Sequence, residues 1–215
     1  MRTTSGPVAP GSTVKERVLV AIGGDEITVP GRDRLTHLQF RRFAGCPVCN
    51  LHLRSVTRRH AEIEAAGVRE VVLFHSPAAE LLPHAEGLPF AVVADPHKRL
   101  YTEFGVQRSW RSLLAPRAWW PVVRSVLSAL PHVARGREHL PSGRPHGGRL
   151  GLPADFLVAP GGRVLAAKYG EHVYDQWSVD EILRLAARHG SSAGESGGGD
   201  RLGEDTGPRG GRVGP

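Results

Sequence analysis

The residues with the clearest chemical potential are two cysteines, Cys46 and Cys49, in the segment FRRFAGCPVCNLHLRS at residues 40–55. They are the only cysteines of the chain, and two residues separate them. A pair this close forms a redox couple, contributes half of a metal site, or is simply two small buried side chains. Two cysteines are too few for a disulfide scaffold.

The surrounding residues predict where the pair lies in a fold. Residues 40–43 are predicted to end a strand, Gly45 to make a turn, and Pro47 is suited to the first position of a helix. Cys46 is then the N-cap, where unpaired backbone N–H groups and the helix dipole favour an anion. We expect this position to lower the Cys46 pKa from about 8.5 towards about 3.5 to 7.5. Cys49, about one turn into the helix, is placed to attack an oxidised Cys46.

Arg41 and Arg42 directly precede this turn. Because successive side chains of a strand point to opposite faces, at most one of the two lies beside the thiolate. We take Arg42 as that active-site neighbour.

A zinc site would use Cys46, Cys49 and His52, in the order C-x2-C-x2-H. Structural zinc takes four ligands, usually from a second matched pair, and the chain has no second CxxC and no HxxxH. A purely structural pair would need neither a helix start nor a proline between its cysteines. A redox couple is therefore favoured, because a strand, a turn, CxxC and a helix before another βαβ unit is the thioredoxin-like signal.

The elements that must position the pair alternate along the chain. Strands are predicted at 17–22, 35–43, 68–76 and 88–96, helices at 47–66, 77–85 and 97–105, and a hairpin at 154–170. Ser178 and Glu181 form a capping box for a final helix, with Trp177 and Ile182 placed as its hydrophobic staple. This order predicts an α/β fold in which helices cover a central sheet.

The predicted domain spans residues 17–190. Residues 1–16 are expected to be a flexible arm, and the Gly/Ser-rich residues 191–215 a disordered tail. Residues 107–150 interrupt the alternation and are treated as an insertion. Its basic apolar core, with Trp119 and Trp120, resembles a membrane-surface helix, but we favour packing on the domain or on a second subunit, as in a homodimer.

The distribution of charged and apolar residues indicates which classes of partner to expect. The chain carries 28 Lys+Arg against 21 Asp+Glu, but its arginines are spread along the whole sequence and no nucleic-acid-binding motif is present. We expect no nucleic-acid partner. The N-terminus lacks the apolar core of a secretory signal, and no apolar run approaches the roughly 18 residues of a membrane span. We therefore expect a cytoplasmic protein, where a close cysteine pair is more often catalytic or metal-binding than structural.

Four segments of the chain resemble the peroxiredoxin-like proteins of the AhpC/TSA group, within the thioredoxin-fold superfamily. They are FRRFAGCPVCNLHLRS, VVLFHS, VVADPHKRLYTEFGV and LPADFLVAPGGRVLAAKYG. The resemblance covers residues 18–106 and 150–190. It implies a thioredoxin-like fold, a central mixed sheet flanked by helices, with the helical insertion before the strand that follows a cis-proline. It also implies that Cys46 is the nucleophile, that Cys49 is the resolving residue, and that Pro153 is the cis-proline facing them.

One departure from that family affects the expected reaction. Typical peroxiredoxins carry P-x-x-x-T/S-x-x-C, whereas Gln39 and Phe43 occupy the proline and hydroxyl positions here. The Pro-Val dipeptide between the cysteines is closer to the CPYC of glutaredoxin. A thioredoxin- or glutaredoxin-like disulfide oxidoreductase without peroxidase activity is therefore an alternative.

Two further residues are candidates near the pair. His75 ends a central strand, where it either accepts a proton near the thiolate or is a hydrogen-bonded strand-end histidine. Asp155 follows Pro153 and is either a base for the resolving thiol or a plain carboxylate at a strand start.

The sequence therefore predicts a thiol-dependent oxidoreductase of antioxidant type that reduces a peroxide or a disulfide with Cys46 and Cys49. An external thiol reductant of the thioredoxin or glutathione type would restore the pair. We expect no bound cofactor and no metal. The competing interpretation is a catalytically silent thioredoxin-fold binding module that uses Trp119 and Trp120 as its contact surface.

Overall fold

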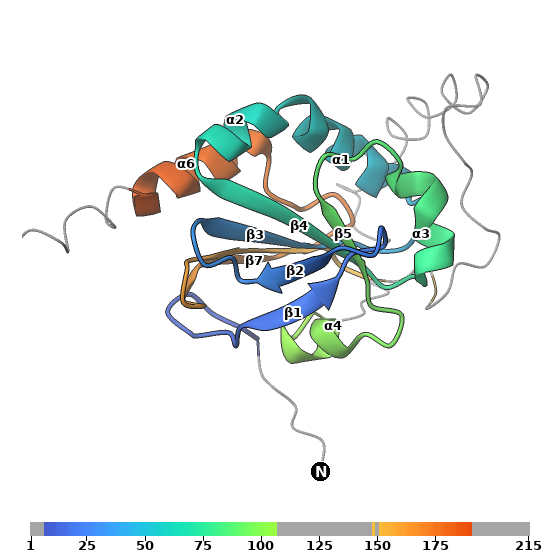
Figure 1. The fold of residues 1–215 in the computed structure, drawn as a ribbon, viewed down its shortest axis with the longest axis horizontal. Coiled ribbons are helices and arrows are strands. Elements are labelled where there is room, and N and C mark those ends of the chain that lie inside the picture. Colours follow the sequence, from blue (N-terminus) through green and yellow to red (C-terminus); the bar gives the residue numbers. More distant parts are fainter. Residues whose placement is uncertain (1–6, 107–147, 149–150, 191–215) are drawn as a thin grey trace, which may run out of the picture.

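A five-stranded mixed sheet forms the centre of the computed structural model, which describes residues 7–106, 148 and 151–190 (Figure 1). The strands lie in the order β5-β4-β3-β6-β7. Their bounds are β3 Leu35–Phe40, β4 Val68–Phe74, β5 Ala91–Ala94, β6 Ala154–Val158 and β7 Val164–Tyr169. β3, β4 and β5 run parallel, and β6 is antiparallel to both β3 and β7. The predicted α/β architecture is confirmed.

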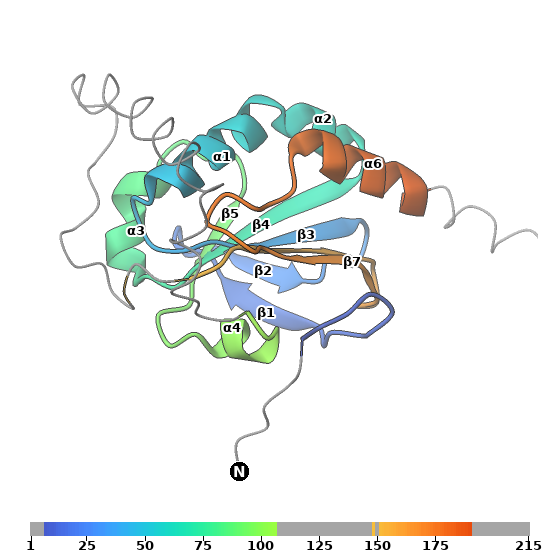
Figure 2. The same cartoon turned by 180° about the vertical axis from the view of Figure 1, so that it is seen from behind.

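Helices cover one face of this sheet, and a hairpin with a short helix covers the other (Figures 1 and 2). The helices of the first face are α1 Pro47–Arg58, α2 His60–Ala65, α3 Ala78–Ala85 and α6 Val179–Gly190. The opposite face carries the hairpin of β1 Arg17–Val20 and β2 Glu26–Val29, together with α4 Arg99–Glu103. Strand alternation on β3 sends Leu38 and Phe40 into the core on the hairpin face, and His37 and Gln39 towards the helices.

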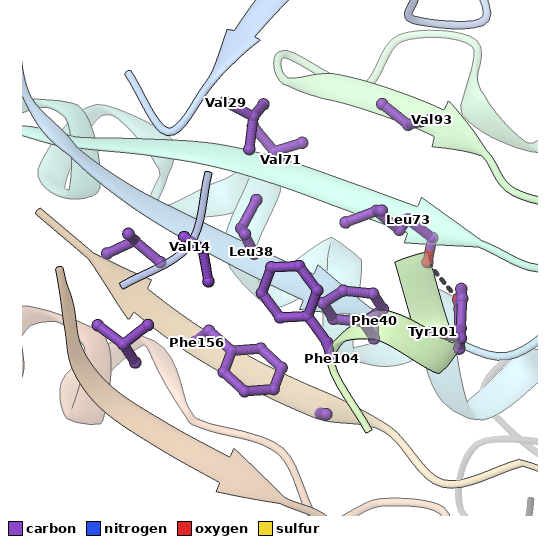
Figure 3. Packing of buried hydrophobic residues seen from close by; sticks show 13 residues of the cluster. Val14, Val29, Leu38, Phe40, Val71, Leu73, Val93, Tyr101, Phe104 and Phe156 are labelled. Atoms are coloured by element: carbon purple, nitrogen blue, oxygen red, sulfur yellow. Dashed lines mark hydrogen bonds between the residues drawn. The ribbon is translucent and has the colours of Figure 1, made fainter. Parts of the chain in front are cut away.

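The core on the hairpin face is aromatic at the end of β3 that leads to the cysteines (Figure 3). The Phe40 ring lies 5.0 Å from the rings of Tyr101 and Phe104 and 5.6 Å from that of Phe156, centroid to centroid. Rings at these distances, in edge-on or tilted arrangements, add to the stability that their burial supplies. The last residue of β3 is therefore held firmly just before the turn that precedes α1.

The helix predicted at 47–66 is divided into α1 and α2 at Arg59. The backbone of Arg59 leaves the helical region, with φ −114° and ψ 21°, and its N–H turns back to the Val56 carbonyl at 3.2 Å. Its guanidinium binds Glu62 at 2.8 Å and Asp180, at the start of α6, at 2.6 Å. These ion pairs pin the tight turn between the two helices, which residue periodicity alone did not indicate.

The start of α6 follows the prediction. The Ser178 N–H donates to Glu181 Oε2 at 2.8 Å, and the Glu181 N–H donates to Ser178 Oγ at 3.3 Å. Trp177 and Ile182 are buried in the same hydrophobic cluster. The capping box and the hydrophobic staple are both present.

Part of the N-terminal segment, predicted as a flexible arm over residues 1–16, packs on the domain. Thr13 bridges Arg163, the Val14 N–H donates to the Gly162 carbonyl at 2.9 Å, and the Val14 side chain is buried. Backbone hydrogen bonds and one buried apolar side chain thus order residues 11–14 against the start of β7. β2, the partner strand of β1, was also not predicted.

Two predicted segments fall largely or wholly beyond the described residues. Of the insertion at 107–150 the structure describes residue 148 alone, so the helix with Trp119 and Trp120 lies outside the described residues. The tail at 191–215 lies outside them entirely. Within the described part of the chain, no helix is both long and apolar enough to cross a membrane.

Candidate active site

The start of α1 has the local structure that the sequence predicted. Gly45 turns the chain with φ +70°, a left-handed conformation that glycine adopts without strain. Cys46 follows as an extended N-cap and Pro47 occupies the first helical turn. The Cys46 sulfur accepts the Cys49 backbone N–H at 3.4 Å, so it satisfies one of the free donors at the helix start.

Both cysteines are reduced and lie side by side at the start of α1. The Cys49 Sγ–H donates to Cys46 Sγ across 2.7 Å. The residues are 1% and 2% exposed respectively, so the pair is removed from water. A disulfide bond of about 2.05 Å would form here by a sulfur displacement of less than an ångström.

The two thiols ionise as a pair. Burial raises the pKa of Cys46 well above that of an ordinary thiol, and the adjacent Cys49 sulfur raises it further. At Cys49 the effect of burial is outweighed by the contact with Cys46 and the charge of Arg42, which lower its pKa to about 7. Because the two sulfurs lie 2.7 Å apart and each affects the ionisation of the other, we assign the value near 7 to the first ionisation of the pair. This differs from the expectation that the helix start would make Cys46 the acidic thiol by itself.

Arg42 is the arginine that faces the pair. It is 5% exposed, its Nη1 donates to Cys46 Sγ at 4.0 Å, and its guanidinium carbon lies 5.2 Å from the centroid of the Phe43 ring. The Phe43 side chain, at the position of the family hydroxyl, therefore supports a cationic donor beside the sulfur. A cation this close favours the thiolate.

His75 and the segment before β6 lie next to Arg42. The His75 backbone N–H donates to the Arg42 carbonyl at 3.2 Å, and the His75 ring packs edge-on against Tyr101 at 5.8 Å. A Cβ atom built on Gly151 would lie 3.7 Å from His75 Nε2 and 3.9 Å from Arg42 Cγ. The fold thus brings His75, Arg42 and residue 151 together at the end of the sheet where α1 begins.

Pro153 differs from the implied cis-proline. Among the described residues the cis peptide bond precedes Pro30, and the bond before Pro153 is trans. Pro153 is buried and its carbonyl accepts the Gly170 N–H at 2.9 Å, which extends the pairing of β6 with β7. A trans bond, the default for X–Pro, carries the extended chain directly into β6.

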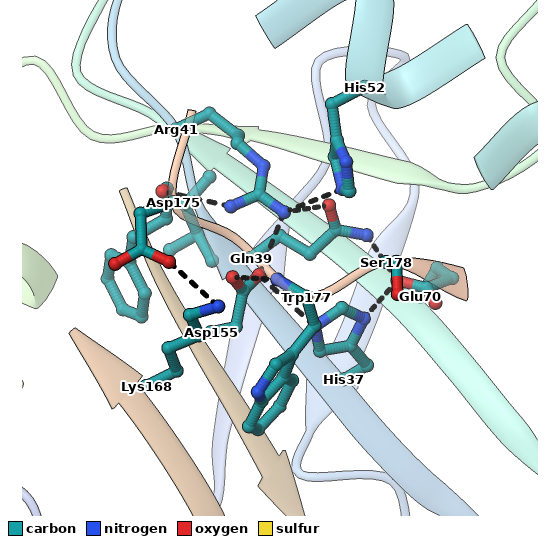
Figure 4. A network of polar contacts seen from close by, with 12 residues as sticks. His37, Gln39, Arg41, His52, Glu70, Asp155, Lys168, Asp175, Trp177 and Ser178 are labelled. Carbon is teal, nitrogen blue, oxygen red and sulfur yellow. Dashed lines mark hydrogen bonds and ion pairs between the residues drawn. The ribbon is translucent and has the colours of Figure 1, made fainter. Parts of the chain in front are cut away.

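Asp155 lies at the centre of a buried polar network beneath α1 (Figure 4). Its Oδ1 accepts from Arg41 Nη2 at 2.8 Å and from His37 Nε2 at 3.2 Å, while its Oδ2 accepts the Trp177 N–H at 3.1 Å. Burial alone would raise the pKa of Asp155, but the Arg41 charge and the His37 hydrogen bond outweigh it and hold the pKa below its usual range. A carboxylate held by three donors is a weak base, so the geometry does not favour the predicted role towards the resolving thiol.

The remainder of this network is also charged. His37 Nδ1 contacts Glu70 Oε2 at 2.8 Å. Burial would lower the pKa of His37, but the charges of Glu70 and Asp155 outweigh it and raise the pKa to about 9, so His37 is a cation at neutral pH. Gln39 connects the two ends of the network, since its amide donates to Glu70 and accepts from Arg41.

His52 links the network to α1. Its Nε2 accepts from Arg41 Nη2 at 3.2 Å, and burial together with the Arg41 charge lowers the His52 pKa well below its ordinary value. His52 therefore faces a guanidinium cation, which would repel a metal ion, and not the two cysteines as a third ligand. Among the described residues no group of three or more His, Cys, Asp or Glu side chains is arranged to hold a metal.

The sequence interpretation did not predict most of this network. No motif marks Glu70, and the sequence indicates other roles for Gln39, at the family proline position, and for Arg41, on the strand before the turn. A signal was present: the polar residues His37, Gln39 and Arg41 alternate with Leu38 and Phe40 along a central strand. Polar residues repeating on one face of a buried strand indicate a hydrogen-bonded network, because buried polar groups are almost always paired.

Solved structures with similar folds include peroxiredoxins and a thiol:disulfide interchange protein. The peroxiredoxin 6 of Arenicola marina, crystallised as a cysteine-to-serine mutant, superposes with a TM-score of 0.61 and 14% identity, over 86% of this chain and 75% of that one. The peroxidoxin BcpB of Mycobacterium tuberculosis gives 0.59 and 17%, over 84% and 97%. A protein assigned as the thiol:disulfide interchange protein DsbE of Chlorobium tepidum gives 0.52 and 15%, over 82% and 96%. At these identities the likeness establishes the fold, which is thioredoxin-like as predicted.

A comparison with curated proteins finds no match. The family model described as AhpC/TSA antioxidant enzyme matches residues 55–172. The matched range begins after Cys46 and Cys49 and continues across the region treated as an insertion. It covers more than half of the sequence, and the chain therefore belongs to the AhpC/TSA antioxidant enzyme family.

Proposed function

We propose that this protein is a thiol-dependent oxidoreductase in which Cys46 attacks an oxidant and Cys49 resolves the product. The observation that carries the proposal is the contact of the two sulfurs, 2.7 Å apart at the start of α1. A first ionisation near pH 7 provides thiolate under neutral conditions. Membership of the AhpC/TSA family supports redox chemistry in general, and the roles of the two cysteines rest on their geometry.

The reaction with a peroxide would proceed in two steps. The Cys46 thiolate attacks one oxygen of the O–O bond, forming a sulfenic acid, while the other oxygen leaves as an alcohol or water after taking up a proton. The Cys49 thiolate then attacks the Cys46 sulfur and displaces the hydroxyl group, which leaves as water with a second proton. An external dithiol, or two thiols of the glutathione type, then reduces the Cys46–Cys49 disulfide.

Two observations favour a small peroxide as the oxidant. Both cysteines are buried, and a small molecule requires less opening of the site than a folded disulfide protein. Arg42 Nη1, 4.0 Å from Cys46 Sγ, is a donor in the region where the family hydroxyl is replaced by Phe43. Arg42 would then hold the peroxide oxygens and stabilise the charge that develops on the leaving oxygen.

Disulfide exchange without peroxidase activity is the second candidate. It is favoured by Phe43 itself, since the hydroxyl that orients the peroxide in typical family members is absent at that position. The CPVC segment also resembles the glutaredoxin motif. In this case the Cys46 thiolate attacks a substrate disulfide sulfur, forms a mixed disulfide and releases one thiol, and Cys49 releases the second. Either reaction fits a cytoplasmic location, where thiol reductants are supplied.

Stopped-flow kinetics would separate these candidates. Fully reduced protein is mixed with stoichiometric hydrogen peroxide, or with a small disulfide, and thiol loss is compared with that of Cys46→Ser and Cys49→Ser variants. Rapid loss of two thiols per chain with peroxide, absent in Cys46→Ser, supports a peroxidase. The Cys49→Ser variant should stop at a sulfenic acid that a dimedone probe captures.

Two other outcomes would not support a peroxidase. Peroxide reaction no faster than that of a free thiol of similar pKa, with rapid disulfide exchange, favours the second candidate. Slow reaction with both oxidants would contradict an enzymatic role and favour a thioredoxin-fold binding module.

A further inference from the structure

Arg41 is a second arginine near the pair, and its backbone is fixed from both sides. Its side chain is 0% exposed. The Arg41 N–H donates to the Leu73 carbonyl at 2.8 Å, which extends the pairing of β3 with β4 by one residue. The Tyr101 hydroxyl contacts both the Arg41 carbonyl and the Leu73 carbonyl. Arg41 therefore enters the space beneath α1 from a rigid strand end.

The guanidinium is held by groups from three different elements (Figure 4). Its Nη2 donates to Gln39 Oε1 on β3 at 2.5 Å, to Asp155 Oδ1 on β6 at 2.8 Å, and to His52 Nε2 on α1 at 3.2 Å. His52 lies three residues after Cys49, and both are on the buried face of α1. Arg41 thus attaches the face of the helix that carries the resolving cysteine to the central sheet.

The positive and negative groups of the network also alternate from one end of β3 to the other. Arg41 follows the strand at the end that leads to Cys46, and His37 lies four residues back, about 13 Å away along an extended chain. Glu70 pairs with His37 at the distant end. Asp155 lies between the two cations and is shared by both. The positive end of the network is therefore the end nearer the cysteine pair.

We propose that Arg41 is a positioning residue that stabilises the thiolate form of the Cys46–Cys49 pair, by holding a fixed positive charge beneath α1 and anchoring that helix through His52. The proposal deepens the proposed function, since it takes the pair to be redox-active. It assigns different parts to neighbouring arginines. Arg42 contacts Cys46 directly, and Arg41 acts through the helix and through its field.

The other polar groups around the pair allow this interpretation. His52 is neutral, so it transmits position but adds no charge. Burial raises the pKa of Tyr101, and that phenol remains uncharged. The network holds two carboxylates: Asp155 binds Arg41 directly and opposes its charge, and Glu70 pairs with His37. The charge of Arg41 also contributes to the lowered pKa of Cys49.

The test is a pH titration of the reduced pair in the full-length protein, monitored by the ultraviolet absorbance of the thiolate and by the rate of alkylation with iodoacetamide. Its midpoint is the pH at which half of the protein carries a thiolate at this pair. Arg41→Gln should raise the midpoint by about one unit, because it removes a nearby cation. Asp155→Asn should lower it by about half a unit, because it removes an anion and keeps the hydrogen-bonding shape. Arg41→Lys should retain most of the wild-type midpoint. The matched control, Arg58→Gln, changes an exposed arginine on α1 and should leave the midpoint unchanged.

Opposite signs for Arg41→Gln and Asp155→Asn would support the proposal. If both variants instead move the midpoint upward, towards an ordinary thiol, the network merely maintains packing and the proposal is overturned. An unchanged midpoint in Arg41→Gln overturns it too. Should circular dichroism show that Arg41→Gln is unfolded, Asp155→Asn decides alone: only a lowered midpoint supports the proposal. The titration uses no oxidant, so a protein inactive towards peroxides and disulfides would still give a result.

Discussion

His37 is a buried cation, and its charge should make the free energy of unfolding depend on pH. Its ring lies between Glu70 Oε2 at 2.8 Å and Asp155 Oδ1 at 3.2 Å, and it packs against the Trp177 ring at 5.5 Å. We predict that His37→Gln abolishes a specific alkaline loss of stability that the wild-type protein shows. The variant keeps an amide that can bond one carboxylate but carries no proton to lose.

The magnitude follows from the two carboxylates. They raise the His37 pKa to about 9 from the ordinary 6.5, against the opposing effect of burial. A group with a raised pKa in the folded state stabilises the protein fully below its unfolded value, and this contribution is lost as pH rises through its folded value. A shift of about 2.5 units at about 1.36 kcal/mol each corresponds to roughly 3 kcal/mol. That contribution should be complete below about pH 6.5 and absent above about pH 9.

Urea unfolding would measure this effect. The free energy of unfolding is compared for the His37→Gln variant and its parent at about pH 6 and about pH 9.5, both in a Cys46→Ser/Cys49→Ser background so that no thiol titrates. The difference between the two proteins should shrink by roughly 3 kcal/mol at the higher pH. His97→Gln, at an exposed histidine, should show no such change. A difference that stays constant over this range would refute the reasoning, since His37 would then carry the same charge throughout.

Three further predictions concern other parts of the fold. Alkylation of the reduced wild-type pair should accelerate as pH rises through about 7, because the pair of Cys46 and Cys49 loses its first proton there; a midpoint like that of a free thiol would contradict the linked ionisation of the two thiols. Ser178→Ala should destabilise the protein by about 1 kcal/mol in urea unfolding, since it removes the side chain that caps α6, and an unchanged midpoint would argue against that cap. Gly162→Ala should loosen the N-terminal segment, because the added Cβ would lie 2.2 Å from the Val14 carbonyl oxygen at a residue with φ +91°. Hydrogen exchange should then show faster exchange of the Val14 amide, and unaltered protection there would contradict this packing.

The local structure around the cysteines could be predicted from the sequence because its causes are local. Gly45 permits the left-handed turn, Pro47 favours a helix start, and the Cys46 side chain satisfies a free N–H of the same helix. The capping box at Ser178 and Glu181 has the same character, with both partners within one turn. Alternation of elements likewise indicated the layered sheet, since each amphipathic segment must bury one face.

The sequence by itself therefore determined the helix-start CxxC, the alternation of strands and helices that builds the central sheet, and the departure of Phe43 from the family pattern. Only the tertiary structure decided which charges meet beneath α1. His37 and Asp155 are 118 residues apart in the chain, and Arg41 and Asp155 are 114 apart, so no local pattern pairs them. The acidity of the thiols was decided there too. The helix start favours an anion at Cys46, but complete burial and a second sulfur at 2.7 Å shift the balance to the pair as a whole. Desolvation and charge pairing depend on the neighbours that folding supplies, and these are absent from any short stretch of sequence.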